Sequence, residues 1–407
     1  MENDTIAAIS TAVSSAGIGI IRISGADAVT VADRVYRSKG GRVHLKDQAS
    51  HTIHYGYIED DDEVVDEVLV MLMRGPKSFT AEDTVEINCH GGVYAVRRVL
   101  EAVLKNGARP AEPGEFTKRA FLNGRIDLSQ AEAVIDVIQA KNEYALKSSV
   151  SQLKGAVQAA VQKIRERILY QIAFIESALD DPEHISLEGY PERLEKEARD
   201  LEQEITHLID SADNGRIMKE GIQTVILGRP NAGKSSLLNA MLGEERAIVT
   251  EVAGTTRDVL EESISLNGLT LNMIDTAGIR ETEDVVERIG VERAKEKAQQ
   301  ADLILYVADS SQELDENDRE ILHSLGGKKA VLILNKSDLP PIVTAENLKK
   351  ITGEQYPVLS VSARKGNGIE LLEQTIRELF YRGELSFNDE VYITNARQKA
   401  DLVNARE

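Results

Sequence analysis

The chain has 407 residues, of which 42% are hydrophobic and 29% are charged, and its formal net charge is −20. This composition predicts a globular protein of roughly two or three domains, and it excludes loose binding to nucleic-acid backbones, which needs clustered Lys and Arg. No run approaches the length of a membrane span, and the single cysteine, Cys89, fits a reducing compartment, so we expect a cytoplasmic protein with no membrane segment.

Residues 1–117 alternate strand-like and helix-like patterns, which predicts an α+β domain. Helical periodicity covers Ala26–Arg37 and Val93–Lys105. Alternating apolar residues predict strands over Ile18–Ile23, Thr52–Glu59, Asp66–Met73 and Thr84–Cys89. The acidic run Asp60–Glu63 suggests a metal site, but acids on a turn between strands more often form a solvated loop, which we favour.

Cys89 and His90 are adjacent, so they could be interpreted as a nucleophile and its base. Consecutive residues of a strand point to opposite faces of a sheet, and we expect these two side chains to point apart. We therefore predict that Cys89 is a buried thiol at the end of a strand and has no catalytic role.

From residue 118 to about 215 the patterns are helical, which predicts a helical domain. An apolar stripe predicts one long helix within Ala131–Leu179, through Leu153, Val157, Val161, Ile164, Ile168, Ile172, Ile175 and Leu179. A second helix, Pro191–Ile209, repeats the stripe through Leu194, Ala198, Leu201, Ile205 and Leu208. We interpret all these positions as the core of a helix bundle, to which we expect residues 384–407 to return.

Residues 216–383 alternate buried strands with helices, which predicts a mostly parallel sheet covered on both faces. The segment Gly228–Ser235 follows the apolar run Thr224–Leu227 and precedes a helical pattern, as in a phosphate-binding loop. In such loops the backbone N–H groups surround phosphate oxygens. Here Lys234 would reach the outer phosphates and the Ser235 hydroxyl would bind Mg²⁺.

Further motifs follow in the order that a GTP-binding protein requires. Asp275–Gly278 ends a predicted strand, where a carboxylate can hold Mg²⁺ through water and an N–H can meet the γ-phosphate. Asn335–Asp338 ends the strand Val331–Leu334, and its terminal carboxylate can accept the ring N–H and the 2-amino group of guanine. Ser362–Arg364 would add backbone contacts to the base. Together these motifs predict guanine-nucleotide binding.

The group that orients the attacking water is not the usual one. Ras-type GTPases place a Gln directly after the Asp-x-x-Gly motif, and this position is Ile279 here. The chain is therefore either a slow nucleotide switch or uses a carboxylate from the acidic run that follows, which contains Glu281, Glu283, Asp284 and Glu287.

The cation ligands also have alternatives. Thr250–Asp258 is the natural first switch loop, in which either Thr255 or Thr256 could complete the coordination of Mg²⁺. Asn231 is either a turn residue or, together with Thr250 and loop carbonyls, part of a monovalent-cation site. Such a cation would supply positive charge where an arginine finger acts in other GTPases.

With these motifs, the chain resembles the bacterial tRNA-modification GTPase family MnmE (TrmE) over essentially its whole length. In the N-terminal part the resemblance depends on strings that GTPases do not generally share, namely Asp4–Ala8, Gly19–Gly25, Cys89–Gly92 and Pro113–Arg125. In the remainder it depends on Gly228–Ser236, Gly254–Asp258 and Asp275–Gly278. The early Pro-Pro-Gly-Arg-Gly-Gly loop of the family reads Ala12–Gly17 here, and the family's C-terminal Cys-x-Gly-Lys tail is absent from the sequence, so we expect an incomplete helical domain.

The resemblance implies a multi-domain protein. Its parts would be an N-terminal α+β domain for tetrahydrofolate binding and dimerisation (1–117), a helical bundle domain (118–215, continued by 384–407) and an inserted α/β P-loop GTPase domain of the Ras type (216–383). The implied activity is K⁺-stimulated, Mg²⁺-dependent GTP hydrolysis by a homodimer, which forms a heterotetramer with the flavin protein MnmG. The two proteins would add an aminomethyl or carboxymethylaminomethyl group to carbon 5 of the wobble uridine of tRNA. The implied folate is 5-formyltetrahydrofolate, with 5,10-methylenetetrahydrofolate as the one-carbon donor.

The resemblance also assigns individual residues. The folate contacts would be Arg22, Glu86 and Arg125. Lys234 would offset charge and Glu287 would orient the water, with Ser235 and Thr256 as Mg²⁺ ligands and Asn231, Thr250, Val252 and Thr255 as K⁺ ligands. The contacts to GTP or GDP would be Asn231, Ala232, Gly233, Lys234, Ser235, Ser236, Thr250, Glu251, Val252, Ala253, Gly254, Thr255, Thr256, Asp275, Thr276, Ala277, Gly278, Asn335, Lys336, Asp338, Ser362, Ala363 and Arg364.

Two other functions compete with this interpretation. A GTP-driven conformational switch, such as a ribosome-assembly GTPase without modification activity, leaves Pro113–Arg125 unexplained, and a P-loop kinase disagrees with Asp338. An acidic protein would meet tRNA through local basic patches, although charged helix positions are more often a solvated face. The candidates for such a patch are Lys147, Lys154, Lys163, Arg165 and Arg167.

Overall fold

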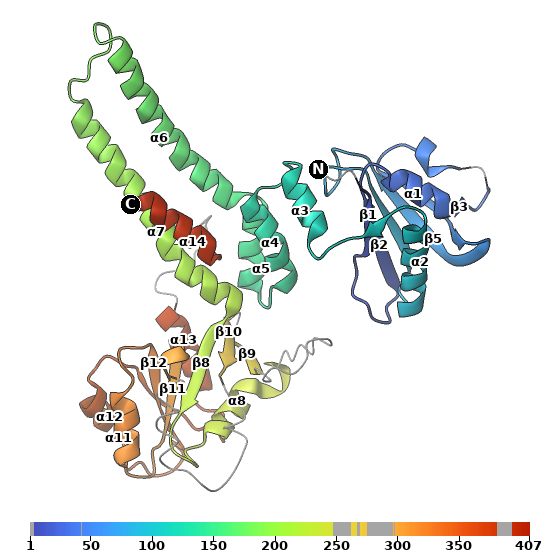
Figure 1. Ribbon diagram of the computed structural model, residues 1–407. Coiled ribbons are helices and arrows are strands. Elements are labelled where there is room, and N and C mark those ends of the chain that lie inside the picture. The colour runs from blue at the N-terminus through green and yellow to red at the C-terminus, as the bar shows by residue number, and fades with distance from the viewer. Residues whose placement is uncertain are drawn as a thin grey trace. The chain divides into compact units, whose positions relative to one another are not determined.

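The computed structural model describes residues 4–41, 43–246, 262–266, 269–274, 296, 298–380 and 393–407. The chain divides into two compact units, of which one is Met1–Ile135 with Leu153–Gln158 and the other is Asp136–Gln152 with Ala159–Glu407. Figure 1 shows the helices and strands of both units. Among the described residues, no helix is both long and apolar enough to cross a lipid bilayer.

A mixed sheet forms the centre of the first unit. Its strands are β1 (Ile6–Ile9), β2 (Ile18–Ser24), β3 (Tyr36–Ser38), β4 (Thr52–Asp60), β5 (Glu63–Met73), β6 (Thr84–His90) and β7 (Arg109–Pro110). They lie in the order β3-β4-β5-β6-β2-β1-β7, and neighbouring strands are antiparallel except for β1 and β7. A short 3-10 helix, η1 (Leu45–Asp47), precedes β4. The strands predicted from the alternating residues are all present in this sheet.

The helices α1 (Ala28–Val35) and α2 (Val93–Lys105) pack on one face of this sheet. Side chains alternate along β5, so Val68 and Val70 are buried under the helices while Leu69 between them is 46% exposed. The opposite face carries a group of exposed apolar side chains, which we call the apolar sheet face: Ile18, Ile53, Tyr55 and Leu69.

Cys89 and His90 point to opposite faces of the sheet, as predicted. The Cys89 thiol is buried with its Sγ 3.4 Å from the carbonyl oxygen of Gly19, and burial raises its pKa to about 11. The exposed His90 ring lies 2.7 Å from Asp66, whose hydrogen bond raises the pKa of the imidazole. The predicted buried thiol at the end of a strand is confirmed, and a thiol that stays protonated at neutral pH is a poor nucleophile.

The first predicted helix is too long. Helix α1 ends at Val35, whereas the sequence predicts a helix to Arg37. The chain leaves the helix here because Tyr36–Ser38 pairs with β4 as strand β3. A long-range strand pairing therefore outweighs the local helical pattern.

The acidic run after β4 is only partly the solvated turn that the sequence predicts. Asp61 and Asp62 are exposed turn residues with positive φ. Asp60, in contrast, is 6% exposed and lies 2.7 Å from Lys105 and 3.6 Å from Arg98. These ion pairs fasten α2 to the sheet, and the described residues contain no group of three or more His, Cys, Asp or Glu that could hold a metal.

A cluster of charged residues fastens helix α3 (Glu115–Leu122) to the start of the chain. The Arg109 guanidinium donates to both carboxylate oxygens of Glu115, at 2.6 and 2.9 Å, and also to Asp4. The buried Arg119 adds hydrogen bonds to Asp4 at 2.7 Å and to Glu115 at 3.1 Å. The Arg109 guanidinium holds the pKa of Glu115 at about 2, well below its ordinary value of 4.5.

The E115Q variant should therefore lose stability in a pH-dependent way. A carboxylate with a lowered pKa stabilises the folded state above its ordinary pKa of 4.5, and this contribution is lost as the pH falls towards 2. We expect the difference in unfolding free energy between wild type and E115Q to be full at neutral pH and to shrink below about pH 4.5. Urea unfolding followed by circular dichroism measures it. The control is E59Q, in which only an exposed ion pair with Arg37 is lost, so little change in unfolding free energy is expected. A difference for E115Q that does not depend on pH would contradict the stabilising role of the ionised Glu115 carboxylate.

The predicted long helix is largely confirmed as α6 (Ala156–Asp180), but the helical segment before it forms the separate helices α4 (Leu128–Gln139) and α5 (Glu143–Leu153), so Leu153 lies outside α6. At the first break, the Asn142 side chain accepts a hydrogen bond from the Ala145 N–H at 2.7 Å and so caps α5. At the second break, Gly155 has a φ of 89°, which favours glycine. Gly155 thus separates Leu153 from the rest of the stripe, and the Asn142 cap separates α4 from α5.

Helices α6 and α7 (Tyr190–Glu220) lie side by side as a hairpin (Figure 1). Arg167 of α6 pairs with Glu197 of α7 at 2.7 Å, and the ring centroids of Phe174 and Tyr190 are 4.7 Å apart. The interpretation of the whole stripe as bundle core is wrong. Val157 and Ile164 are buried, but several residues of the two stripes are exposed: Val161, Ile168, Ile172 and Leu179 on α6, and Ala198 on α7.

Helix α7 continues to Glu220, past the domain boundary that the sequence predicts near Gly215. Gly215 is needed because a Cβ there would lie 2.1 Å from the carbonyl oxygen of Ile393, where the chain crosses α7 on its return. Ile393 donates its N–H to the Ser211 hydroxyl at 3.2 Å, and α14 (Ala396–Arg406) then packs on α7. The expected return of the C-terminal segment to the helical domain is confirmed.

The second sheet is formed by the part of the chain between the end of α7 at Glu220 and the return at Ile393. Its strands are β8 (Ile222–Leu227), β9 (Glu262–Leu266), β10 (Leu269–Met273), β11 (Leu303–Asp309), β12 (Ala330–Asn335) and β13 (Val358–Ser360). They lie in the order β13-β12-β11-β8-β10-β9, and neighbours are parallel except for β9 and β10. The predicted mostly parallel sheet is confirmed.

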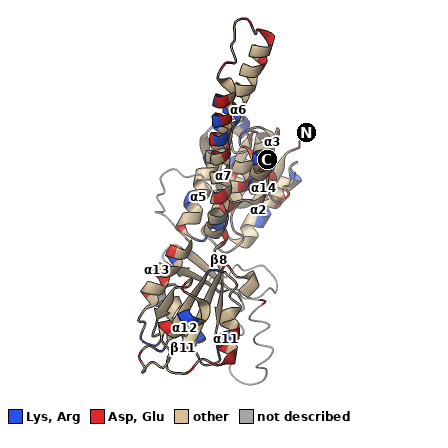
Figure 2. Cartoon of the chain, turned by 90° about the vertical axis from the view of Figure 1, so that its left-hand side faces the viewer, with Lys and Arg blue, Asp and Glu red and all other residues tan. Residues whose placement is uncertain are grey.

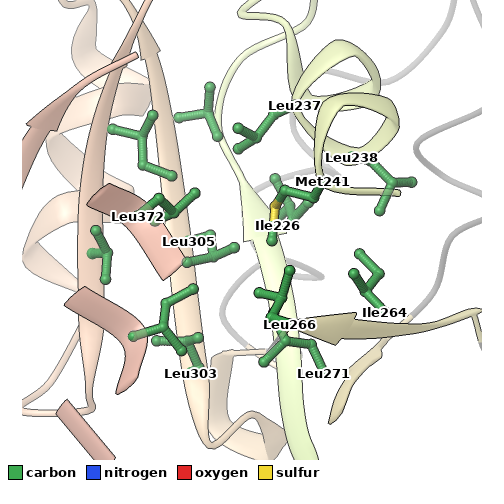
Figure 3. Packing of buried hydrophobic residues seen from close by; sticks show 14 of the residues in the cluster. Ile226, Leu237, Leu238, Met241, Ile264, Leu266, Leu271, Leu303, Leu305 and Leu372 are labelled. Carbon is green, nitrogen blue, oxygen red and sulfur yellow. The ribbon is translucent and has the colours of Figure 1, made fainter. Parts of the chain in front are cut away.

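Helices cover both faces of this second sheet. Leu303 and Leu305 of β11 face one side, where α8 (Lys234–Arg246) packs through Leu237 and Met241 and α13 (Ile369–Phe380) adds Leu372 (Figure 3). The alternate residues of β11, Ile304 and Tyr306, face α11 (Glu316–His323) and α12 (Ala345–Thr352). Because both faces are buried, the strands are nearly continuous apolar runs, and polar residues gather where the strands end.

Candidate functional site

The loop between β8 and α8 has the backbone that phosphate binding requires. Gly228 has a φ of 140°, and a Cβ there would lie 2.1 Å from the carbonyl oxygen of Val307, so only glycine fits. Asn231 and Gly233 also have positive φ, at 61° and 95°. Helix α8 begins at Lys234, so the positive end of its dipole lies next to the loop.

The Lys234 ammonium lies inside this loop. Its Nζ donates to the carbonyl oxygens of Gly228 at 2.8 Å and Arg229 at 2.7 Å, and burial lowers its pKa. Ser235 and Ser236 follow in the first turn of α8. The arrangement holds a positive charge and a helix start where phosphate oxygens would bind.

Asn335 connects this loop to the predicted base-recognition segments. Its side chain is 2% exposed, donates to the Ala232 carbonyl oxygen at 2.9 Å and accepts from the Ala363 N–H at 3.1 Å. Gly233 makes room for it, since a Cβ there would lie 2.1 Å from the Asn335 Nδ2. One buried amide therefore fixes the position of Ser362–Arg364 relative to the phosphate-binding loop.

Asp338 lies beside Asn335 at the end of β12. Its Oδ1 accepts a hydrogen bond from the Ser362 hydroxyl at 2.7 Å, which lowers the pKa of the carboxyl group. Lys336, with a φ of 60°, pairs with the buried Asp309 at 2.6 Å and so fixes the turn that carries Asp338. The result is an ionised, oriented carboxylate that can accept the paired N–H donors of guanine.

The structure thus brings together the predicted residues Asn231, Ala232, Gly233, Lys234, Ser235 and Ser236 with Asn335, Lys336, Asp338, Ser362, Ala363 and Arg364. The other predicted nucleotide and catalytic residues lie outside the described residues: Thr250, Glu251, Val252, Ala253, Gly254, Thr255, Thr256, Asp275, Thr276, Ala277, Gly278 and Glu287. Of the predicted cation ligands, the structure describes Ser235 and Asn231.

A second group of predicted residues meets in the N-terminal unit. Arg22 and Glu86 face each other across β2 and β6 and form an ion pair at 2.7 Å. The Arg22 guanidinium also lies 5.2 Å from the ring centroid of Phe79 and 5.6 Å from that of Phe116. The guanidinium of Arg125 lies 5.1 Å from the Phe79 centroid. We call these five residues the aromatic-cation cluster.

Sequence reasoning missed the two aromatic members of this cluster. Phe116 lies within the string Pro113–Arg125, which was a usable signal. Phe79 lies in the connection between β5 and β6, which carries no periodic pattern. Only the fold brings Phe79 to Arg22 and Arg125.

The candidate basic residues of the helical segments do not form one free patch. Arg167 pairs with Glu197 and Glu204, and Lys147 pairs with Glu143 at 2.6 Å. Lys154, Lys163 and Arg165 are exposed. Acidic and basic residues are mixed along α6 and α7 (Figure 2).

A glycine-rich loop between a parallel strand and a helix, joined by Asn335 to a guanine-type aspartate, defines a P-loop protein of the GTP-binding class. Residues 5–125 match the family model described as the N-terminus of the GTP-binding protein TrmE, and residues 128–407 match the model of the MnmE helical domain. The chain therefore belongs to the MnmE family.

Two relatives named as MnmE agree with this membership. The tRNA modification GTPase MnmE of Lachnoclostridium phytofermentans is 58% identical over 406 residues, which are 100% of this chain and 88% of that protein. The protein of the same name from Geobacillus kaustophilus is 51% identical over 408 residues, again 100% of this chain and 88% of the relative. Among solved structures, the G domain of the T. maritima FeoB iron transporter is 28% identical and covers 39% of this chain and 99% of its own, with a TM-score of 0.30.

Proposed function

We propose that this chain hydrolyses GTP with the help of Mg²⁺ and K⁺ and uses hydrolysis, as a homodimer with the flavin-containing partner MnmG, to modify carbon 5 of the wobble uridine of tRNA. As a member of the MnmE family the chain is a GTPase with a role in tRNA modification. The observation that carries the proposal is the Asn335 side chain, which joins the phosphate-binding loop to the segment that supports Asp338. The partner, the cations and the chemistry on uridine are the parts that need testing.

We propose that different described residues recognise the base and bind the phosphates of the nucleotide. Asp338 would accept the ring N–H and 2-amino group of guanine, which adenine lacks, and so select GTP against ATP. Lys234 would exchange the carbonyl oxygens of Gly228 and Arg229 for the outer phosphate oxygens. Its charge would offset the negative charge that develops as water attacks the γ-phosphate in line. Glu287, which lies outside the described residues, is the proposed water-orienting carboxylate.

The cation ligands are proposed from the same site. Ser235 lies in the first turn of α8, directly after Lys234 in the chain, which is the usual position of a Mg²⁺ ligand in such loops. Mg²⁺ supplies charge neutralisation on the phosphates when it is bound. We propose Ser235 and Thr256 as its ligands. For K⁺ we propose Asn231, Thr250, Val252 and Thr255.

We further propose that the aromatic-cation cluster binds 5-formyltetrahydrofolate, with 5,10-methylenetetrahydrofolate as the one-carbon donor. The pterin and benzoyl rings of a folate are flat, and the rings of Phe79 and Phe116 could stack on them. Glu86 would accept pterin N–H groups, whereas Arg22 and Arg125 would meet carbonyl and carboxylate oxygens. The cluster therefore has donors, acceptors and aromatic surface of the kinds that a folate needs.

The R22A variant should weaken the binding of 5-formyltetrahydrofolate by about tenfold to a hundredfold, because a hydrogen bond to a charged group contributes ~1.5–3 kcal/mol. The change also removes the cation that pairs with Glu86. Isothermal titration calorimetry on the full chain measures the affinity. R37A, which loses only an exposed pair with Glu59, should bind like wild type. Unchanged affinity in R22A would remove Arg22 from the site.

The apolar sheet face is the surface that we propose for dimerisation. Ile18 and Ile53 are 63% and 60% exposed there, and Tyr55 and Leu69 are 44% and 46% exposed. Tyr55 and Leu69 are direct neighbours across β4 and β5, and exposed apolar side chains that gather on one face mark an interaction surface more often than scattered ones do. Arg22 and Glu86 stand on the same face of the sheet, so a second chain would border the proposed folate site.

The partners are tested by capture from solution. The full chain, carrying an affinity tag, is incubated with cell lysate, and bound flavin, tRNA and ribosomal subunits are measured. Retention of a flavin protein and tRNA would support the proposal. Co-sedimentation with ribosomal subunits, with neither flavin nor tRNA retained, would favour a GTP-driven switch in ribosome assembly.

A further inference from the structure

Arg229 belongs to the phosphate-binding loop, but its side chain contacts the start of α11. Its Nε lies 2.8 Å from the Oδ2 of Asp318, and one terminal nitrogen lies 3.3 Å from the Oδ2 of Asp315. The other terminal nitrogen donates to the carbonyl oxygen of Glu313 at 3.0 Å. The guanidinium therefore connects the loop with the N-terminal turn of α11 through three acceptors.

The main acceptor of Arg229 is a buried carboxylate. Asp318 is 1% exposed, and its Oδ1 accepts from the hydroxyl of the fully buried Tyr306 at 2.6 Å. Its Oδ2 also accepts from the Asp315 N–H at 3.2 Å as part of the capping box of α11. A buried carboxylate needs an opposite charge, which Arg229 supplies. Tyr306 pairs in register with Leu227, the residue before the loop, so this cluster lies directly behind the loop.

The backbone of Arg229 contacts the functional side of the loop. Its carbonyl oxygen accepts from the Lys234 Nζ at 2.7 Å and from the Ala232 N–H at 3.4 Å. The same residue thus joins a buried carboxylate behind the loop to the ammonium inside it. A shift of the Arg229 backbone would move the Lys234 acceptor and the N–H groups that face the phosphates.

We infer that Arg229 is a positioning residue for the nucleotide: its attachment to Asp318 holds the phosphate-binding loop in the conformation that receives phosphates. The inference rests on the proposed function, because it requires the loop to bind GTP and GDP. A loop that is held in advance loses little conformational entropy when the phosphates bind, so the contribution of Arg229 appears mainly in affinity. Arg229 acts through the loop and is not itself proposed to touch the γ-phosphate or the attacking water.

The test compares R229Q, R229K and wild type as full chains. R229Q removes the charge at similar length, and we expect GDP affinity to fall about tenfold, the scale of one charge-assisted hydrogen bond. R229K keeps a charge for Asp318 but not the planar fork, so its loss should be smaller. In GTP hydrolysis, KM should rise while kcat changes less. The control is T344A, which removes the N-cap of α12 in the same domain and lowers thermal stability without touching the loop.

The outcomes separate positioning from simple structural support. If R229Q melts earlier, as T344A does, but binds GDP like wild type, the inference is overturned. If R229Q does not fold, R229K and D315N decide, since D315N keeps a capping residue on α11 but removes the charge beside Arg229. A loss of about two- to fivefold in D315N supports the inference, and unchanged GDP affinity in both variants overturns it. A wild-type chain that binds no GDP would contradict the proposed function itself.

Discussion

Replacing Asp338 with asparagine should lower the affinity for GTP and GDP by on the order of 10⁴-fold, the scale on which a site built for specific hydrogen bonds rejects a mismatched group. In wild type the carboxylate would accept two N–H donors of guanine. In D338N the amide NH₂ would face one of these donors, so one hydrogen bond becomes a repulsion. Ser362 holds the Asp338 Oδ1 at 2.7 Å, which limits the freedom of the side chain to avoid this conflict. Titration with a fluorescent GDP analogue measures the loss.

Xanthine nucleotides supply the control for D338N. Xanthine has a carbonyl group where guanine has its 2-amino group, so the asparagine NH₂ regains an acceptor. We expect D338N to prefer xanthosine diphosphate over GDP and to keep the thermal stability of wild type. Wild-type affinity for GDP in D338N would mean that the base is recognised by other residues.

GTP turnover in KCl should exceed turnover in NaCl at equal ionic strength, and E287A should abolish most of it. If a K⁺ ion at Asn231 replaces an arginine finger, its effect on the rate is about 10³–10⁵-fold. Glu287 would act on the same step by orienting the attacking water, so its loss should lower kcat more than it raises KM. Release of inorganic phosphate from the full chain measures both effects.

Two further variants make this second test specific. E281A changes a carboxylate of the same acidic run and should leave the rate near that of wild type. N231A should reduce the rate in KCl to the rate in NaCl while GDP still binds. Equal, slow turnover in both salts would leave the protein as a nucleotide switch, with Asn231 only a turn residue.

Much of the fold could be predicted because the patterns are local. The stripe over Val93–Lys105 predicts α2 with its observed ends, and the buried runs of the nucleotide-binding domain predict its parallel strands. The phosphate-binding loop and Asp338 could also be found in the sequence, since strand, motif and helix are contiguous there. These are features that neighbouring residues decide.

The errors lie where distant residues decide. Tyr36–Ser38 is a strand and not the end of a helix, because it pairs with β4. Gly215 does not end α7, and its missing side chain makes room for the returning chain at Ile393. Asp60 is buried because Lys105, which lies on another element, supplies its charge partner. Neither these contacts nor the approach of Phe79 to Arg22 leaves a periodic signal in the sequence.

The chain leaves the helical domain at the end of α7 and returns to it against Gly215, and this arrangement suggests how such a chain could arise and be engineered. The nucleotide-binding domain starts at Gly221, directly after α7, and the chain comes back at Ile393 against Gly215, less than two helical turns earlier. A domain whose two ends lie this close together can be inserted or removed in one genetic event without disrupting the structure of the domain that carries it. The nucleotide-binding domain is therefore a single insertion in the helical domain. After its removal, a short glycine-rich linker from Gly221 to Ile393 should suffice to reconnect the helical domain.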